Sequence, residues 1–244
     1  MDPAAYIEMA EVESRHWWFT GRRAIITSLL ERLGLPKNAR ILEIGCGTGG
    51  NLAMLSAFGK VSAFDMEESA RTIASKKTGG VYDIRAGYCP DRIPFKDERF
   101  DLICLFDVLE HIQQDSETLA AIRALLTENG RVLITIPAYR WMYGVHDRFL
   151  HHHRRYSSHE IREKVHASGY RFARMSHFNT LLFPIAAAVR VKERLLGSKA
   201  AAGGKVPAAF VNNLFRKVFT AERGWLKHFN FPFGVSLLCV LEKA

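Results

Sequence analysis

Short apolar runs alternate along this chain with stretches in which apolar side chains recur at helical spacing. The runs at 40–44, 60–64, 81–86, 100–106, 131–136, 170–177 and 235–241 predict β-strands, and the stretches at 48–58, 67–77, 115–127 and 158–168 predict helices. Alternation of this kind predicts a largely parallel sheet with helices on both of its faces. The pattern therefore indicates an α/β, doubly wound fold.

Three stretches do not fit a plain alternation. Residues 6–33 predict two helical pieces divided at Thr20-Gly21, and residues 138–156 form a loop too long for a plain connector. About 57 residues separate the last two strands, and they hold an apolar segment, a small-residue linker at 197–204 and an amphipathic stretch. We therefore divide one domain into an N-terminal helical cap (1–38), a Rossmann-like core (39–178 and 233–244) and a helical insertion or lid (179–232).

A glycine-rich turn, ILEIGCGTGGN, joins the first strand to the first helix of the core. Gly45 and Gly47 remove side chains where the backbone turns sharply or a ligand comes close. The helix start behind them carries unpaired N–H groups, and Asp65 ends the next strand about 20 residues later, where a carboxylate can accept both hydroxyls of a ribose. No Lys-Ser or Lys-Thr closes the loop and Glu43 would repel a phosphate, so a phosphate-binding loop is disfavoured.

The motif E-I-G-C-G-T-G-G-N followed by F-D-M resembles the S-adenosylmethionine (SAM) site of class I methyltransferases. The segment 93–112 resembles the fourth-strand region of the same superfamily, in the branch that includes the ubiquinone-biosynthesis O-methyltransferases. The resemblance covers roughly residues 38–140. It implies the strand order 3-2-1-4-5-7-6 with strand 7 antiparallel, and SAM as the cofactor. A Rossmann dehydrogenase is disfavoured because its fingerprint is G-x-G-x-x-G.

The resemblance implies where each part of SAM is held. Glu43 is expected to accept from the ammonium group, and Met66 either packs on the adenine or makes an ordinary apolar contact. Arg22 or Arg23 either pairs with the SAM carboxylate or belongs to a packed cap. Tyr88 stands where the family often has Asp, so the adenine contact stays open between Tyr88, a backbone group and Asp91. The expected cofactor-binding residues are Arg22, Glu43, Gly45, Cys46, Gly47, Asn51, Asp65, Met66, Tyr88, Asp107 and Val108.

Two histidines are candidate general bases, because the pKa of histidine suits proton removal near pH 7. His111 follows the fourth strand, at the end of the sheet that faces the reaction centre, although it can equally bond to the backbone at a helix start. His146, in the 138–156 loop, is the first candidate, with Asp147 orienting another group.

Aromatic and basic side chains of the 138–156 loop suit an anionic or aromatic acceptor. Alternatively, Arg154, Arg155 and Tyr156 pin this loop to the core. Of the adjacent Trp17 and Trp18, one is expected to pack on the sheet and the other to face ligand or solvent. The candidate substrate-binding residues are Trp18, Tyr139, Trp141, Tyr143, Arg154 and Arg155.

Neither the cysteines nor the histidine run 151–153 predicts a metal site. The four cysteines show no C-x-x-C spacing and are expected to be free thiols in a reducing cytoplasm. The consecutive histidines point in different directions. The first residues lack the apolar core of a signal peptide, and no run reaches the about 18 apolar residues that span a bilayer. We expect a cytoplasmic protein without a resident metal.

The net charge of +9 is uneven, because residues 140–230 hold 17 Lys and Arg against five Asp and Glu. A basic face attracts anionic substrates, a membrane surface or nucleic acid, or is simply a solvated surface. The apolar and basic segment 179–196 suggests peripheral membrane contact, with a helical lid as the alternative. No RNA-binding module and no N-P-P-Y motif is evident, so nucleic acid is not an expected partner.

Together these features predict an enzyme that moves a methyl group from SAM to a small-molecule acceptor, by O-methylation of an anionic or lipid-linked compound. The alternative is an RNA or protein methyltransferase that docks through the basic C-terminal region. A non-catalytic subunit with the same fold is disfavoured by the intact glycine turn and Asp65. The sequence discloses neither the acceptor nor the oligomeric state.

Overall fold

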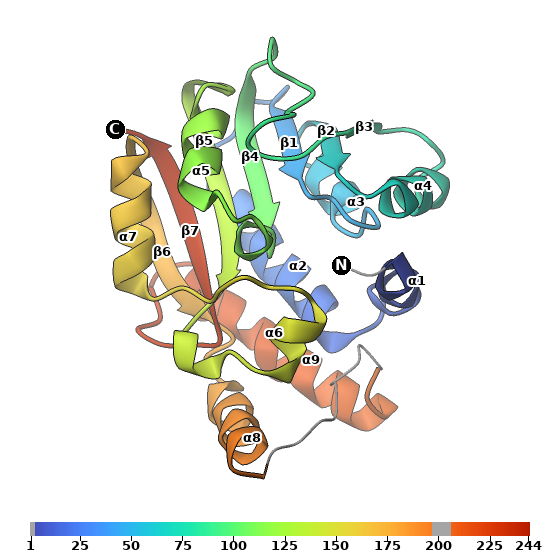
Figure 1. Ribbon diagram of the computed structural model, residues 1–244, viewed down its shortest axis with the longest axis vertical. Helices are drawn as coiled ribbons and strands as arrows, with labels where there is room; N and C mark the ends of the chain where they lie inside the picture. Colours follow the sequence, from blue (N-terminus) through green and yellow to red (C-terminus); the bar gives the residue numbers. More distant parts are fainter. Residues whose placement is uncertain (1–2, 197–205) are drawn as a thin grey trace.

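A seven-stranded sheet forms the centre of the computed structural model, which describes residues 3–196 and 206–244 (Figure 1). The strands are β1 (Arg40–Ile44), β2 (Lys60–Asp65), β3 (Asp83–Ala86), β4 (Phe100–Phe106), β5 (Leu126–Pro137), β6 (Tyr170–Phe178) and β7 (Ser236–Lys243). Their order is β3-β2-β1-β4-β5-β7-β6, and β7 pairs antiparallel with both β5 and β6. The predicted α/β fold and its strand order are confirmed.

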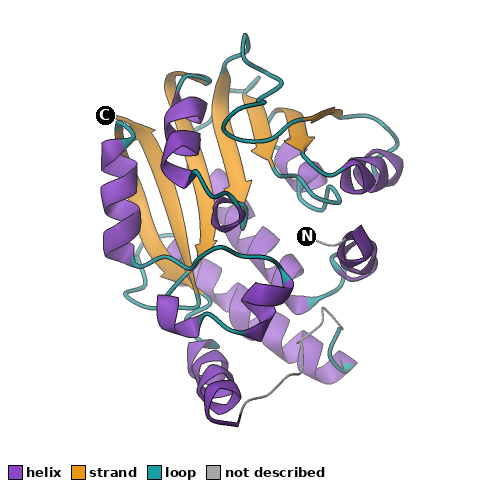
Figure 2. Cartoon of the chain, in the orientation of Figure 1, coloured by secondary structure: helices purple, strands orange, loops and turns teal. Residues whose placement is uncertain are grey.

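Helices cover both faces of the sheet (Figure 2). On one face lie α5 (Asp115–Arg123) and α7 (Ser158–Ala167), and on the other lie α2 (Trp17–Leu30), α3 (Leu52–Ser56) and α9 (Ala209–Leu226). Side chains of β1 alternate between these layers: Leu42 and Ile44 join the core under α5 and α7, and Ile41 joins the core under α2. A sheet buried on both faces explains why its strands are continuous apolar runs.

The remaining elements gather near the carboxyl ends of the parallel strands or lie outside the layers. They are α1 (Pro3–Val12), α4 (Glu68–Lys77), η1 (Leu109–His111), η2 (Arg140–Met142), α6 (Val145–Phe149) and α8 (Phe183–Leu196). In Figure 1, α1 and α6 lie below the strand ends. This arrangement places the N-terminal segment and the long loop after β5 beside the glycine turn after β1, so all three meet at the edge where doubly wound sheets bind ligands.

The helical break predicted at Thr20-Gly21 is wrong. The chain breaks between α1 and α2 instead, where the His16 side chain caps α2 by accepting from the Trp18 N–H at 3.2 Å. Gly21 lies inside α2, where a Cβ would be 2.5 Å from Cδ1 of Phe219. Glycine is used there for close helix packing, and not as a helix breaker.

Other element boundaries also differ from the expectations. The helix predicted over 115–127 ends at Arg123, because Leu126 already pairs with Phe100 in the sheet. The long loop after β5 contains η2 and α6. The linker predicted at 197–204 lies outside the described residues.

The segment between β6 and β7 contains α8 and α9, which pack very differently. α9 lies against α2, and the Trp18 ring stacks on Phe219 with centroids 5.2 Å apart. No residue of α8 is buried, and its apolar side chains Ile185 and Val189 are about half exposed. Within the described residues, none of the helices has the length and apolar character needed to cross a membrane.

Candidate cofactor and acceptor site

The backbone of the glycine turn favours glycine at several positions, two of which face the end of β2 and the segment after β4. Gly45 and Gly47 adopt the left-handed region, with φ of 66° and 52°. A Cβ on Gly45 would also lie 2.7 Å from Val108, which follows β4. The Gly47 N–H donates to Oδ2 of Asp65 at 2.8 Å, so the turn and the end of β2 are tied together. This fixes the predicted residues Gly45, Gly47, Asp65 and Val108 around one point.

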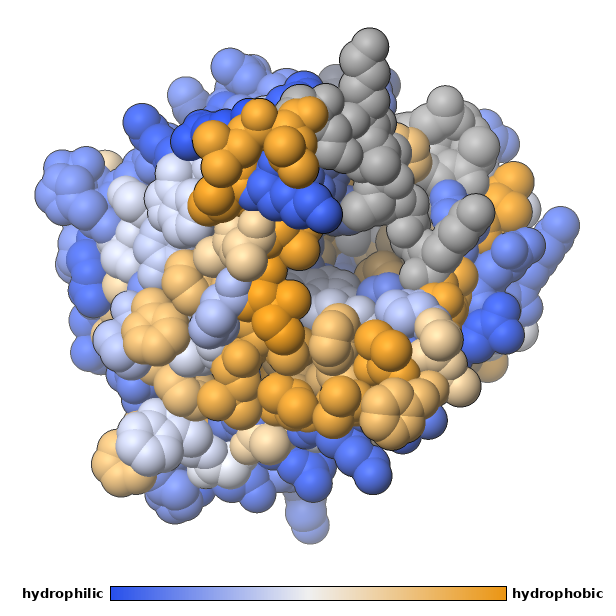
Figure 3. Space-filling model, turned by 90° about the horizontal axis from the view of Figure 1, so that it is seen from below, coloured by the Kyte–Doolittle hydropathy of each residue, from blue (hydrophilic) through white to orange (hydrophobic). Residues whose placement is uncertain are grey.

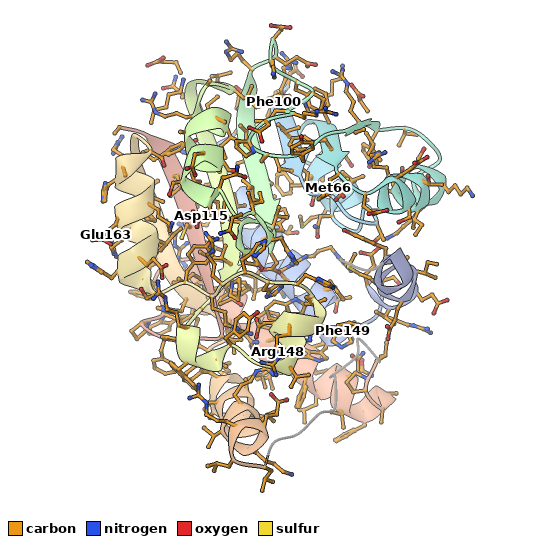
Figure 4. The ribbon with its side chains drawn as sticks, viewed as in Figure 1. Met66, Phe100, Asp115, Arg148, Phe149 and Glu163 are labelled. Carbon is orange, nitrogen blue, oxygen red and sulfur yellow. The ribbon has the colours of Figure 1, made fainter. Side chains whose placement is uncertain are left out.

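Asp65 is a buried carboxylate at the end of β2. Burial raises its pKa, while hydrogen bonds from the backbone N–H groups of Glu67 and Gly47 oppose that rise. A carboxylate oxygen can accept two hydrogen bonds, so Asp65 retains capacity for the hydroxyls of a ribose. Figure 4 shows Met66 beside it at the end of β2, and this side chain is 73% exposed. An exposed thioether at this point is available to pack on a base.

Glu43 and Asn51 form a buried polar pair under the turn. Nδ2 of Asn51 donates to Oε1 of Glu43 at 2.8 Å, whereas Oε2 of Glu43 and Oδ1 of Asn51 have no hydrogen-bond partner among the described residues. Burial raises the pKa of Glu43 from 4.5 to about 8. Buried acceptors without donors are costly, and an ammonium group of a ligand satisfies both. The pair therefore fits the methionine end of SAM.

Arg22 reaches the end of β4 from α2. Its guanidinium forms an ion pair with Asp107, whose Oδ1 also accepts from Thr135 at 3.1 Å and whose φ is 56°. Nε of Arg22 is buried and has no partner among the described residues. Arg22 thus keeps a donor for a ligand carboxylate, as predicted for SAM, while Asp107 orients it.

Two other predicted cofactor residues lie at the rim of this region. Tyr88 is 39% exposed, and Cζ of Arg92 lies 5.8 Å from the centroid of its ring. Cys46 is buried within the turn, and burial raises the pKa of its thiol far above its usual range. Cys46 is therefore a neutral, packed thiol, and its contribution is through its backbone. The adenine contact stays a prediction.

The N-terminal helix α1 lies over the glycine turn, as a cap, through contacts that the sequence did not indicate. Glu13, just after α1, accepts from the Thr48 hydroxyl at 2.7 Å. Cε of Met9 is 3.3 Å from the position that a Cβ on Gly47 would take. Tyr6 is buried, and burial together with the nearby carboxylates raises the pKa of its hydroxyl. These contacts join segments far apart in the chain, and no local motif announces them.

The candidate base His111 lies in an environment that disfavours a charged ring. Burial, with the neighbouring His152, lowers the pKa of His111 from 6.5 to about 3. A ring with this pKa is a poor proton acceptor near pH 7, so a general-base role for His111 remains a prediction without support from its surroundings. His146 is half-buried on α6, and its role as a base also remains a prediction.

The 138–156 loop is pinned to the core through Asp115 of α5, and Asp147 ties the loop to itself. Asp147, fully buried, lies 2.7 Å from Nε of Arg155, and Asp115 lies 2.7 Å from Arg154 and accepts from the Tyr156 hydroxyl at 2.9 Å. The expectation that Arg155 binds substrate is not supported, because its buried guanidinium is held by Asp147 and the Ala138 carbonyl. Arg154 keeps some exposure, but Asp115 engages it.

The aromatic candidates for the acceptor lie in two different surroundings. Trp18 stacks on Phe219, Trp17 packs edge-on against the same ring, and both are half-buried, so acceptor binding by Trp18 remains a prediction. Tyr139 stacks on His177 with centroids 5.5 Å apart, and Trp141 is 42% exposed. Tyr143 donates to the carbonyl of His152 at 2.8 Å. Acceptor binding by Tyr139, Trp141 and Tyr143 remains a prediction. Figure 4 shows Arg148 and Phe149 on α6, which follows these residues in the chain.

A glycine turn after β1, a carboxylate at the end of β2 and this strand order define the cofactor site of a class I methyltransferase. A family model described as a methyltransferase domain matches residues 18–174. The chain therefore belongs to the SAM-dependent methyltransferases, and the resemblance found in the sequence is confirmed.

Individual relatives are distant. An uncharacterized methyltransferase of Staphylococcus carnosus is 33% identical over 111 residues, which cover 44% of this chain and 52% of the relative. The ubiquinone biosynthesis O-methyltransferase of Photobacterium profundum is 24% identical over 148 residues, which cover 55% of this chain and 63% of the relative. The chain thus spans about half to two thirds of the length of these relatives.

A similar solved structure covers nearly the whole chain. It is the complex between the Haloferax volcanii Trm112 methyltransferase activator and the putative methyltransferase, matched with a TM-score of 0.62 at 18% identity. The match covers 98% of this chain and 93% of the other. At this identity the similarity shows a shared fold.

Proposed function

We propose that this protein transfers the methyl group of SAM to an oxygen of a small-molecule acceptor that is anionic or lipid-linked. The observation that carries the cofactor part is the buried set of Glu43, Asn51 and Arg22, each with a polar atom lacking a partner among the described residues, beside Asp65. An ammonium, a carboxylate and a ribose together match these groups. The similarity to a ubiquinone biosynthesis O-methyltransferase supports oxygen as the acceptor atom.

The residues present divide the work of holding the cofactor. Asp65 would accept the ribose hydroxyls, Glu43 and Asn51 would accept from the ammonium, and Arg22 would donate to the carboxylate. SAM, when bound, supplies a methyl group already activated on a sulfonium. The protein then needs to align the acceptor with that methyl and exclude water, and both tasks depend on rigid placement. α1 and the pinned 138–156 loop provide that placement at the strand ends.

Titration calorimetry with SAM tests the cofactor site. Asp65→Ala removes two charge-assisted hydrogen bonds, each worth about 1.5–3 kcal/mol, so we expect the affinity to fall at least about 10-fold. Asp83→Ala is the matched control, because Asp83 is an exposed carboxylate on the adjacent strand β3. Unchanged SAM affinity in Asp65→Ala, or no binding by the wild type, would rule out this site.

A lipid-linked acceptor is supported by the surface around α8 and α9. Figure 3, which views the molecule from below, shows apolar side chains spread widely over this face. Among the exposed apolar residues of this segment are Leu181, Ile185, Val189, Leu195, Leu196, Phe210, Leu214 and Trp225. α8 also carries Arg190, Lys192 and Arg194, of which Arg190 pairs with Glu193 at 2.7 Å. Apolar and basic side chains on a surface helix suit an interface with anionic lipid.

A macromolecular acceptor is the second candidate, because the same basic segment suits an RNA or an acidic protein. Binding of RNA through phosphate contacts weakens steeply as salt is raised. A gel-shift titration with mixed cellular RNA at low salt checks this. A salt-sensitive complex at micromolar protein would favour RNA over the small-molecule proposal.

A further inference from the structure

Three metal-ligating side chains meet beyond the end of β4. The ligand atoms of Glu110, His111 and His152 all lie within 4.8 Å of one another. Glu110 and His111 belong to η1, and His152 comes from the segment after α6. The His153 N–H donates to the Glu110 carbonyl at 2.9 Å and fixes the two segments side by side. The cluster is therefore assembled by the pinned loop.

Glu110 is the strongest sign that a ligand belongs here. Its side chain is 0% exposed, and neither carboxylate oxygen has a hydrogen-bond partner among the described residues. A buried carboxyl group without partners is costly, and a cation placed against it removes that cost.

His152 is held so that one ring nitrogen is directed to Glu110. Its Nδ1 lies 3.0 Å from Oδ1 of Asp147. The same Asp147 oxygen also lies 2.7 Å from Nε of Arg155. With Nδ1 turned to Asp147, Nε2 is the His152 ring nitrogen that faces Glu110, 4.0 Å from its Oε1. A carboxylate that orients a histidine in this way is typical of metal sites.

His111 completes the cluster. Its ring hydrogen-bonds to the backbone of His151 and stands perpendicular to the His152 ring, with centroids 4.6 Å apart. One ring nitrogen is thereby anchored and the other is left for a ligand. Two ligands each about 2.1 Å from a shared ion lie at most about 4.2 Å apart, so the cluster closes on an ion with shifts under about 1 Å.

We propose that Glu110, His111 and His152 form a site for one divalent transition-metal ion, with Asp147 as the positioning residue for His152. Two imidazoles and one carboxylate are the donor set of catalytic zinc sites and of non-haem iron(II) sites, which keep open coordination positions. Magnesium and calcium prefer sets made of oxygen. This proposal replaces the expectation from the sequence that no metal is bound.

The place of this site suggests what the ion does. Glu110 follows three residues after Asp107, which pairs with Arg22 at the end of β4. An open coordination position there would bind an oxygen of the acceptor beside the cofactor. This use of the ion rests on the proposed function, whereas metal binding does not.

Metal titration of the untagged, chelator-treated protein tests the site. We expect one equivalent of Zn²⁺ to bind in calorimetry, and Co²⁺ to give visible absorption bands of a nitrogen- and oxygen-ligated ion. Glu110→Gln and His152→Gln should each weaken Zn²⁺ binding at least 10-fold. His159→Gln is the matched control, because His159 is an exposed histidine on α7 that pairs with Glu163.

SAM titration of the same variants separates the two proposals. Retained SAM affinity in Glu110→Gln together with lost Zn²⁺ binding supports the metal site and shows that the variant is folded. If Glu110→Gln does not fold, the wild-type Co²⁺ spectrum decides. Absence of Co²⁺ bands from the wild type, or equal Zn²⁺ affinity in the wild type and both variants, would overturn the proposal. Failure to bind SAM would contradict the proposed function alone.

Discussion

Four buried carboxylates at the strand ends divide into two kinds. Asp65 and Asp147 accept hydrogen bonds from neighbouring groups and organise the chain around them. Glu43 and Glu110 each keep at least one buried oxygen without a donor among the described residues. Contacts within the described residues do not satisfy the second kind, which is why we propose a ligand for each of them. Asp65 has both roles in our proposal, because its oxygens can also accept from a ribose.

Glu43 makes the stability of the free protein depend on pH. Its pKa is 4.5 when the carboxyl is free in water, as in the unfolded chain, and about 8 when it is buried in the fold. Between these values the unfolded chain releases a proton that the folded chain retains, so stability is full below pH 4.5 and is lost as pH rises to about 8. Glu43→Gln should remove this pH-dependent loss of stability. The difference in the free energy of unfolding between Glu43→Gln and wild type should therefore grow in favour of the variant by up to about 1 kcal/mol per pH unit.

Urea unfolding at pH 5, 6, 7 and 8 without SAM measures this effect. Glu98→Gln serves as control, because Glu98 is a partly exposed carboxylate that pairs with Arg40. A constant difference between Glu43→Gln and wild type across these pH values would contradict the assignment.

At the same scale, the sequence identifies residues whose roles follow from local spacing. Gly45, Gly47 and Asp65 belong to a motif in which strand, turn and strand end are adjacent along the chain. The positions of Met9 over the turn and of His152 against Glu110 depend on loops that close over tens of residues. The spacing of residues along the chain carries no signal for such contacts. Neither the contact of Met9 with the turn nor that of His152 with Glu110 could therefore be predicted from the sequence.

Helix packing decides where the N-terminal elements begin and end. A glycine in a helical pattern suggests a break, because glycine costs about 1 kcal/mol relative to alanine within a helix. Here Gly21 remains inside α2, since the Phe219 ring of α9 occupies the space beside it. The low helix propensity of glycine predicted a helix break at Gly21, but packing against Phe219 keeps this residue helical. The parallel sheet, by contrast, followed from the alternation of elements, and its strand order from the family resemblance.

The contact between α2 and α9 gives a prediction for two substitutions. Gly21→Ala should destabilise the protein by about 1–2 kcal/mol, because a methyl group 2.5 Å from a buried ring outweighs the gain in helix propensity. In a Phe219→Leu background the same Gly21→Ala change should be neutral or stabilising. Thermal unfolding of the four proteins measures the coupling.

Gly224→Ala provides the control on α9, where a Cβ meets nothing within 4 Å. It should stabilise the helix by a few tenths to about 1 kcal/mol. Additive effects of Gly21→Ala and Phe219→Leu would show that the ring does not restrict this position.

Over the whole molecule, charge and exposed apolar surface coincide. The segment 140–230 carries the positive charge, with 17 Lys and Arg against five Asp and Glu, and also contains the exposed apolar side chains of α8 and α9. The cofactor-binding half is close to neutral. One segment of the sequence therefore combines most of the positive charge with much of the exposed apolar surface of the described residues.

Flotation with vesicles tests this arrangement. The protein should float with vesicles that contain anionic lipid and remain at the bottom with neutral ones, because each basic residue near the surface contributes about 1 kcal/mol. Ile185→Ser with Val189→Ser on α8 should reduce flotation several-fold, since both side chains are half exposed. Val81→Ser, an exposed apolar residue away from this face, should have no effect. Equal flotation of all variants would show that α8 does not contact lipid.

The position of α1 over the glycine turn has a kinetic consequence. Met9 lies against Gly47, Tyr6 lies near Asp65, and Glu13 fastens the end of the helix to Thr48. We expect SAM to enter past this cover, so each round of catalysis must discard the demethylated cofactor and load a fresh molecule beneath α1. Opening of the first helix should then set a ceiling on turnover, however fast the methyl group itself moves.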